Sequence, residues 1–405
     1  MKATLLTDKR ISKKISRQEG IINYDDDNAY PQRVTDILNS SATGSLCHNL
    51  AVKFIVGNGF ADSQFYKSKL NSKGLTADKL LRKVADNLKK FNGVAIHINY
   101  NALYQKTSYN FIPFEWCRLT SEESNFPYKL AVYDDWQKIE GRINKDNIEY
   151  LDFFNDNPAI IEQQVQEAGG WENYKGQVYY YTTVGKSYPL SPIDSILEDM
   201  QTDAKTKLFK YRNVSTNFMA SHFIEVNEFE SDEERNEFES QLADFQGADD
   251  ALKMMLVERK ATEESAIEIK KVDIQNVERL YEYTETSVRD SIIRNYLIPP
   301  VLLLQTAGKM GTSKEILDAV NYYNGVVDYE QLIIEEIFTD LFKNSIIKND
   351  GNFSIISLKA QVETAEVINL IANTNLTIDQ KISSLTLLYG FTKEEAINLS
   401  GIWVI

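Results

Sequence analysis

The chain has 405 residues, with 44 lysines and arginines against 59 aspartates and glutamates, so its formal charge at pH 7 is −15. This acidity argues against tight, salt-sensitive wrapping of DNA, which needs basic patches that displace counterions. It does not exclude DNA that passes nearby without being gripped. The length suggests two to four structural units with a sizeable core.

The ends and the cysteines restrict the class of protein further. Residues 1–20 contain six lysines and arginines but no sustained apolar segment, so we expect no secretory signal. We expect a disordered basic arm there, or alternatively an arm that touches nucleic acid or a neighbouring subunit. No apolar run is long enough to span a membrane. Cys47 and Cys117 fit a reducing compartment and leave one disulfide open, while the three scattered histidines show no zinc-site spacing.

The first part of the chain predicts an α+β body. A helix is expected over 34–53, followed by a turn at Gly57 and Gly59. Its expected core positions are Ile37, Leu38, Leu46, Leu50 and Phe54. A second helix is expected over 76–91, where Leu80, Leu81, Val84, Leu88 and Phe91 have helical spacing.

Several short strands follow this second helix. Residues 94–100 alternate, which puts Val94, Ile96 and Ile98 on one face and His97 on the other. Further strand patterns occupy 109–119, 129–136, 148–154 and 176–183. Short strands mixed with helices are typical of the α+β class.

Two long helices then enclose an insertion. The first is expected from Ser191, a candidate N-cap, to about Arg212. Its apolar stripe is Ile193, Leu197, Met200, Ala204, Leu208 and Tyr211. The second is expected over 273–296. Its expected inner face is Ile274, Val277, Tyr281, Val288 and Ile292, with Thr284 filling the gap.

The insertion between the two helices is strongly acidic. Strands are expected at 222–226, 253–258 and 266–272, with a helix over 231–245 that starts at a capping box of Ser231 and Glu234. Residues 225–268 hold 15 acidic and 4 basic side chains, a net charge of −11. We weigh two interpretations evenly: a solvated face, or an acidic docking surface or channel wall that repels phosphate.

The stretch "RNYLIPPVLLLQTAGKMGTSKE" (294–315) separates the second long helix from a third. Pro299 and Pro300 end the helix near Ile298, because proline cannot continue it. We expect 301–304 to be extended or irregular, followed by a glycine-bearing loop. A third helix is expected over 313–344 with a kink at Gly325. Short helices follow at 363–373, 377–390 and 392–402, two of them with capping boxes.

Catalytic signatures are absent from the sequence. "GKMGTS" has glycine, lysine and serine in the wrong order for a phosphate loop, and no zinc-protease motif or nucleophile elbow is present. Abundant carboxylates leave open a hydrolase with a carboxylate pair, although no two of them stand out. We predict no enzyme activity and no cofactor.

The order of these elements resembles the portal proteins of tailed bacteriophages over about residues 24–345. The opening helix and glycine turn (30–60), the strand "FIPFEWCRL" and the helix entered through "YPLSPIDSILEDMQ" appear in the family's order. "ALKMMLVE", "IEIKKVDIQNVERL" and "IIRNYLIPPVLLL" continue it. The short carboxy-terminal part departs from larger portals.

The resemblance implies a portal-like α+β fold with these parts: basic arm 1–20, α/β wing 21–190, stem helix 191–221, small α/β clip 222–272, stem helix 273–298, tunnel-loop region 299–312, long kinked wing helix 313–350 and short helical crown 351–405. It further implies a ring, dodecameric in the family, at one capsid vertex of a virion assembled in the host cytoplasm. Double-stranded DNA would pass through the ring without sequence-specific contacts during packaging and ejection. The terminase large subunit, a neck or adaptor protein and the major capsid protein would be its partners, and no membrane is involved.

Two sets of residues take site roles from the resemblance. The tunnel loop falls on Gln305 through Ser313, with Gln305, Thr306, Lys309, Met310, Thr312 and Ser313 as candidates and Lys309 as a transient phosphate contact. The alternative for this segment is a surface loop. The clip residues expected to be exposed toward motor or adaptor are Glu228, Glu230, Glu233, Glu234 and Glu237. The competing hypotheses for the whole chain are another multimeric head–tail connector of a virion and, more remotely, the carboxylate-pair hydrolase.

Overall fold

The structure is a computed structural model. It describes residues 20–136, 147–215, 222–227, 231, 235–236, 255–259, 268–271, 277–303, 313–359, 364–373, 375–387, 391 and 393–401. The chain forms two compact units. Unit 1 comprises residues 1–39, 44–197 and 293–405, and unit 2 comprises 40–43 and 198–292.

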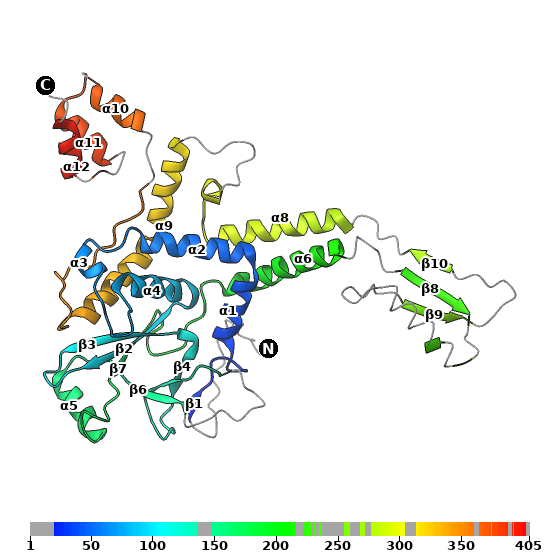
Figure 1. Cartoon of the computed structure of the whole chain (residues 1–405), viewed down its shortest axis with the longest axis horizontal. Helices are drawn as coiled ribbons and strands as arrows, with labels where there is room; N and C mark the ends of the chain where they lie inside the picture. The colour runs from blue at the N-terminus through cyan, green and yellow to red at the C-terminus, as the bar shows by residue number, and fades with distance from the viewer. Residues whose placement is uncertain are drawn as a thin grey trace, which may run out of the picture. The chain divides into compact units, whose positions relative to one another are not determined.

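Unit 1 contains a mixed seven-stranded sheet with the order β1-β4-β5-β6-β7-β2-β3 (Figure 1). Its strands are β1 (Ile21–Ile22), β2 (Gly93–Tyr100), β3 (Lys106–Ile112), β4 (Cys117–Thr120), β5 (Leu130–Val132), β6 (Glu149–Phe153) and β7 (Gln177–Thr182). All neighbouring pairs are antiparallel except β6 and β7. The predicted strand over 109–119 is instead two strands, β3 and β4, separated by a 3-10 turn after Pro113, whereas the other strands predicted for this part of the chain are present. Val94, Ile96 and Ile98 are buried as expected.

Helix α4 (Ala77–Phe91) packs on β2 and on α9 (Ser313–Phe342). All five of its predicted core residues are buried, because its apolar positions recur every three or four residues. The helix ends at Asn92, whose positive φ of 55° lets its N–H bond the Leu88 carbonyl.

The predicted helix over 34–53 is instead two helices, α1 (Tyr30–Ser40) and α2 (Ala42–Val56). The prediction was also wrong for Leu46, which is exposed, whereas Phe54 is buried. The turn after α2 is confirmed, with positive φ at Gly57 and Gly59. There Phe60 joins a cluster of phenylalanines from α3 (Ser63–Tyr66), α9 and the segment that follows α9, namely Phe65, Phe338, Phe342 and Phe353.

The remaining elements of unit 1 are short. Helix α5 is Pro158–Glu167, and 3-10 turns occupy η1 (Phe114–Trp116), η3 (Asp194–Ile196) and η4 (Pro300–Leu303). Of the extended or irregular structure expected at 301–304, the extended alternative is wrong for Val301 to Leu303, which belong to the 3-10 turn η4. The predicted helices near the end are present as α10 (Thr364–Ala372), α11 (Ile378–Leu387) and α12 (Lys393–Gly401), which pack around Ile371, Leu385 and Ala396.

Unit 2 is built from parts of α6 (Leu197–Ser215) and α8 (Val277–Asn295) and a separate three-stranded sheet, β10-β8-β9. Its strands β8 (His222–Asn227), β9 (Met255–Arg259) and β10 (Glu268–Lys271) match the three strands predicted for the insertion. The first long helix begins later than predicted: Ser191 lies before η3, and the α-helix starts at Leu197. The fold class is α+β, as predicted.

Candidate functional site

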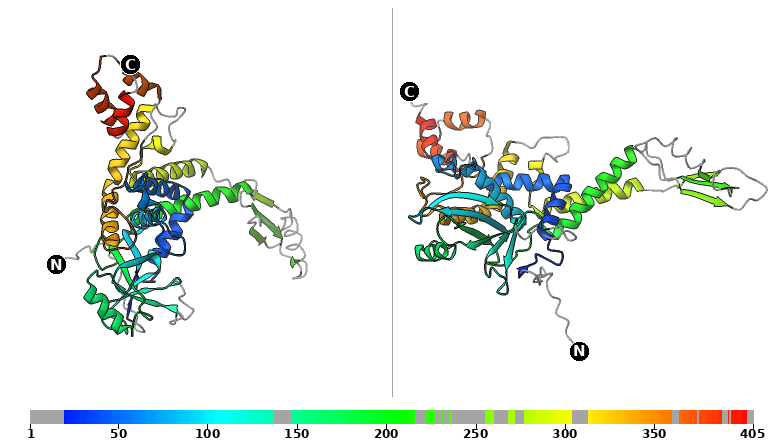
Figure 2. Two further views of the ribbon diagram at one scale, coloured as in Figure 1. Left: turned by 60° about the vertical axis from the view of Figure 1, so that its left-hand side comes forward. Right: turned by 60° about the horizontal axis from the view of Figure 1, so that its bottom comes forward.

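Helices α6 and α8 lie side by side and antiparallel (Figures 1 and 2). Two side-chain contacts join them in opposite chain order, Ser291 with Asp199 and Lys210 with Glu285. Asn295 at the end of α8 also contacts Ser195 in η3, just before α6. The Ser291 hydroxyl donates to the Asp199 carboxylate over 2.5 Å.

The predicted apolar stripe of α6 is buried over only part of its length. Ile193 and Met200 are buried as expected, but Leu208 and Tyr211 are 47% and 69% exposed. Phe209 on α6 and Tyr283 on α8 are also exposed, by 37% and 74%. Exposed large apolar side chains on two neighbouring helices are typical of interaction surfaces, so this end of the pair is a candidate interface. We call Leu208, Phe209, Tyr211 and Tyr283 the aromatic end.

The two helices carry opposite charge around the aromatic end. Residues 205–212 of α6 contain Lys205, Lys207, Lys210 and Arg212, and α8 contains Glu282 and Glu285 beside Tyr283. Lys210 and Glu285 pair with each other within one chain, and Lys207 pairs with Asp203, so part of this opposite charge is satisfied inside the helix pair.

Asp203 anchors α6 within unit 2, although it occupies a buried position that the stripe analysis did not select. Its carboxylate accepts from the Ser41 hydroxyl (2.6 Å) and the Thr43 N–H (3.1 Å), and its other oxygen lies 2.8 Å from Lys207 Nζ. Burial raises the pKa of Asp203, but Lys207 and these hydrogen bonds outweigh burial and hold it below its ordinary value. Asp203 therefore caps the start of α2 from a distant point in the sequence.

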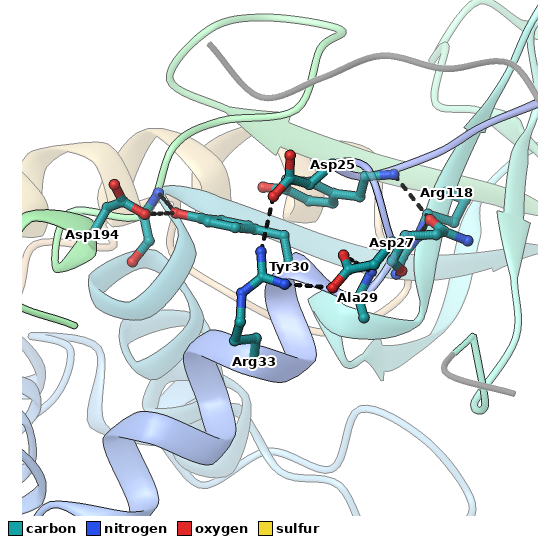
Figure 3. Close-up of polar contacts among 10 residues, drawn as sticks. Asp25, Asp27, Ala29, Tyr30, Arg33, Arg118 and Asp194 are labelled. Carbon is teal, nitrogen blue, oxygen red and sulfur yellow. Dashed lines mark hydrogen bonds and ion pairs between the residues drawn. The ribbon is translucent and has the colours of Figure 1, made fainter. Parts of the chain in front are cut away.

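A second polar network lies in unit 1, around the turn before α1 (Figure 3). Arg33 pairs with Asp25 at 2.8 Å and with Asp27 at 2.5 Å. The Tyr30 hydroxyl donates to Asp194 Oδ1 at 2.7 Å, and burial foremost raises its pKa far above the ordinary value. These contacts fix the turn and the segment that leads into α6.

Arg118 on β4 is fully buried beside this network. Its guanidinium donates to five neutral oxygens: Asn28 Oδ1, Asn28 O, Glu115 O, Cys117 O and Gln32 Oε1. It also lies 5.6 Å from the Tyr24 ring and 5.2 Å from the Trp136 ring. Because each of its five guanidinium N–H groups donates a hydrogen bond within the protein, Arg118 stabilises the fold and has no donor left for a ligand. Its strand pattern gave no signal of this role.

The sequence-predicted site residues fall almost entirely outside the described residues. In the tunnel loop this holds for Gln305, Thr306, Lys309, Met310 and Thr312, whereas Ser313 is the first residue of α9. The clip candidates Glu228, Glu230, Glu233, Glu234 and Glu237 also lie outside, as does the basic arm up to residue 19. Their roles remain predictions.

Other chemistry is limited in the part of the chain that the structure describes. Cys47 and Cys117 are buried free thiols, which answers the question of a disulfide, and burial strongly raises the pKa of Cys117. Within the described ranges, no group of three or more histidine, cysteine or acidic side chains is arranged to hold a metal ion. Among the same residues, no helix is long and apolar enough to cross a membrane.

Comparison with solved structures gives the fold a match. A chain from the neck of an empty gene transfer agent (GTA) particle, computed with C6 symmetry, matches with a TM-score of 0.50 and 10% identity, covering 92% of this chain and 93% of that chain. A chain from the virion of a native GTA particle scores 0.49 at 10% identity, with 91% and 93% covered. An HK97-family phage portal protein from Corynebacterium diphtheriae scores 0.42 at 11% identity, with 71% and 83% covered.

No protein-family model and no curated protein matches the chain in sequence. The fold assignment rests on the first structural match, which extends over nearly the whole of both chains. The chain therefore shares its fold with a chain in the neck of that particle, at an identity too low to carry over residue roles.

Proposed function

We propose that this chain is a portal-type subunit of a phage-like particle, which assembles into a ring that conducts double-stranded DNA. The fold shared with a particle-neck chain supports the assignment. The observation that carries ring formation is the exposure of Leu208, Tyr211 and Tyr283 at the aromatic end of the α6–α8 pair. The role is structural and requires no catalytic group.

A head-to-tail ring is compatible with the chemistry of the pair. Contact between the basic flank of α6 in one copy and the acidic flank of α8 in the next would be heterologous, and a heterologous contact forms a ring when its rotation closes. The neck in the first structural match was computed with C6 symmetry. A ring of six or of twelve subunits satisfies such symmetry, and we propose twelve.

The finer assignments complete the proposal. The wing, stem, clip, tunnel-loop and crown boundaries are those given from the sequence. The acidic insertion would meet the packaging motor and then a neck or adaptor protein, and the loop from Gln305 to Ser313 would face DNA in the bore. A net charge of −15 favours sliding, because the excess of carboxylates over cations repels phosphates. The particle's capsid vertex is the proposed location.

Mass photometry and electron-microscope class averages test ring formation. We expect particles far larger than the 46.4 kDa monomer, with a central hole. Tyr211→Glu combined with Tyr283→Glu should shift the protein to monomers, because two charges would then occupy the apolar contact. Leu103→Glu, at a position that is 74% exposed in a hairpin loop, serves as control and should leave the rings unchanged. Rings that persist in the double variant would exclude the aromatic end as the interface.

A further inference from the structure

A basic surface lies on unit 1 of this acidic protein. Residues 67–83 contain six lysines and arginines and a single acidic residue, Asp78. Lys69, Lys73, Lys79, Arg82 and Lys83 are all exposed, and among the described residues none of the five has a carboxylate partner within ion-pair distance. We call these five side chains the basic surface. Unpaired cations of one sign raise the local concentration of anionic partners.

The members of the basic surface are held in place by backbone contacts. The Leu70 N–H donates to the Leu75 carbonyl over 2.8 Å, and the Ala77 N–H donates to the Ser68 carbonyl over 3.0 Å. The Lys79 ammonium donates to the Gly74 carbonyl at 3.3 Å, which keeps it beside the Lys73 loop. The cations thus lie on an ordered loop and on the first turns of α4.

A hollow of about 700 Å³ borders the basic surface, and Lys73 and Lys83 line it. Residues of strands β2 and β3 also line it, among them Asn99 and Asn110 with their side-chain amides. Trp116 and Phe111 add aromatic faces, and Lys83 Nζ lies 4.9 Å from the centre of the Phe111 ring. The hollow therefore combines cations, amides and aromatic rings.

The hollow's own acidic charge is small. Glu149 is the one carboxylate among its lining residues, and its Oε1 lies 4.0 Å from Lys175 Nζ. The ligand that this chemistry fits is anionic and polar, with apolar groups for the rings. Amide side chains pair with peptide N–H and C=O groups, and ammonium groups pair with carboxylates.

We propose that the basic surface and the hollow together bind an extended segment of a partner protein rich in glutamate and aspartate. The volume, in the range of ligand pockets, accepts a few residues of an extended chain. A DNA duplex presents its phosphates on a wide convex cylinder, which would touch the lysines but leave Trp116 and the amides without contact. The binding surface lies outside the aromatic end, so it does not depend on ring formation.

Fluorescence anisotropy on the full-length chain tests this. The probe is a short fluorescein-labelled peptide of glutamate, aspartate, glycine and phenylalanine, compared with a peptide of the same length that has lysine in place of the acidic residues. We expect saturable binding of the acidic probe only. Lys73→Glu with Lys83→Glu should weaken it by about tenfold or more, and Trp116→Ala by a few-fold. Lys393→Glu, which alters an exposed lysine on α12, is the matched control and should change binding little.

Each result decides the proposal. Equal weakening by Lys393→Glu would mean that general charge, not this surface, holds the probe, and would overturn it. Unchanged binding in Trp116→Ala would show that the hollow does not bind the peptide and would overturn that part of the proposal. A labelled DNA duplex that binds in place of the peptide, and loses binding in the lysine variants, would replace the partner protein with nucleic acid. Mass photometry of the same variants should show unchanged rings, so failure here is separate from failure of the proposed assembly.

Discussion

Lys106 is a buried lysine whose protonation makes the free energy of unfolding depend on pH. It is the first residue of β3, has 1% exposure and contacts the end of α9. Its ammonium donates to the Asp340 carbonyl over 2.7 Å and lies 4.7 Å from the Phe154 ring. Burial lowers the pKa of Lys106 from 10.5 to about 8, an effect that Asp156 and Asp340 oppose and Lys343 assists.

The lowered pKa of Lys106 sets the direction in which the free energy of unfolding changes with pH. In the unfolded chain Lys106 loses its proton only near pH 10.4, whereas in the folded chain it loses it near pH 8. The folded state thus binds fewer protons between these values, and its free energy of unfolding rises with pH. Keeping Lys106 charged in the folded state lowers the free energy of unfolding by about 3 kcal/mol at low pH. About 2 kcal/mol of this is recovered between about pH 7 and 9.5, as the folded protein loses the proton.

Replacing Lys106 with methionine removes this dependence while keeping an unbranched apolar chain. We expect the stability difference between wild type and Lys106→Met to move in favour of wild type by about 2 kcal/mol from about pH 7 to 9.5. Guanidinium unfolding followed by tryptophan fluorescence measures it. Lys348→Met, at an exposed lysine, is the control and should show no such shift. The same shift in both variants, or in neither, would refute a buried, charge-penalised Lys106.

Three further predictions concern stability. Arg118→Lys should lower the free energy of unfolding by more than about 3 kcal/mol, since lysine has too few donors for five buried acceptors. A loss below about 1 kcal/mol in chemical denaturation would contradict this. Asp203→Ala should destabilise the helix pair by about 2 kcal/mol at neutral pH. The difference from wild type should shrink as the pH falls, because the carboxylate, whose pKa is lowered in the folded state, stops contributing to stability once it is protonated. Thermal circular dichroism against Glu198→Ala, on the exposed side of α6, checks it. Gly57→Ala should lower the free energy of unfolding by at least about 1 kcal/mol more than Gly185→Ala in the same melts. Both glycines have positive φ, but of the two only Gly57 would place the new methyl group 2.2 Å from a carbonyl oxygen, that of Ile356.

Local patterns in the sequence predicted most of the secondary structure. Helix α4 and strand β2 have clean periods, and both were placed to within a residue or two. The capping box of Thr377 and Gln380 forms both of its hydrogen bonds at the start of α11. Such features depend on neighbours a few residues away, which the sequence contains.

Partnerships between distant segments were not predictable in this way. Leu46 has the spacing of a core residue yet faces water, and Asp203 is charged yet buried, because its partners Ser41 and Thr43 lie some 160 residues away. The apolar stripe of α6 gave no indication that its far end would remain exposed within one chain. The basic surface was also overlooked, since a total charge of −15 conceals a local excess of cations.

By itself, then, the sequence determined the α+β class, the order of the elements and the acidity of the molecule, because periodicity, capping and charge are local or additive properties. The tertiary structure alone decided that Arg118 and Lys106 are buried, that the ends of α6 and α8 expose aromatic rings, and that Lys73 and Lys83 border one hollow. Burial and proximity are set by which distant segments pack together. No single stretch of the chain carries that information.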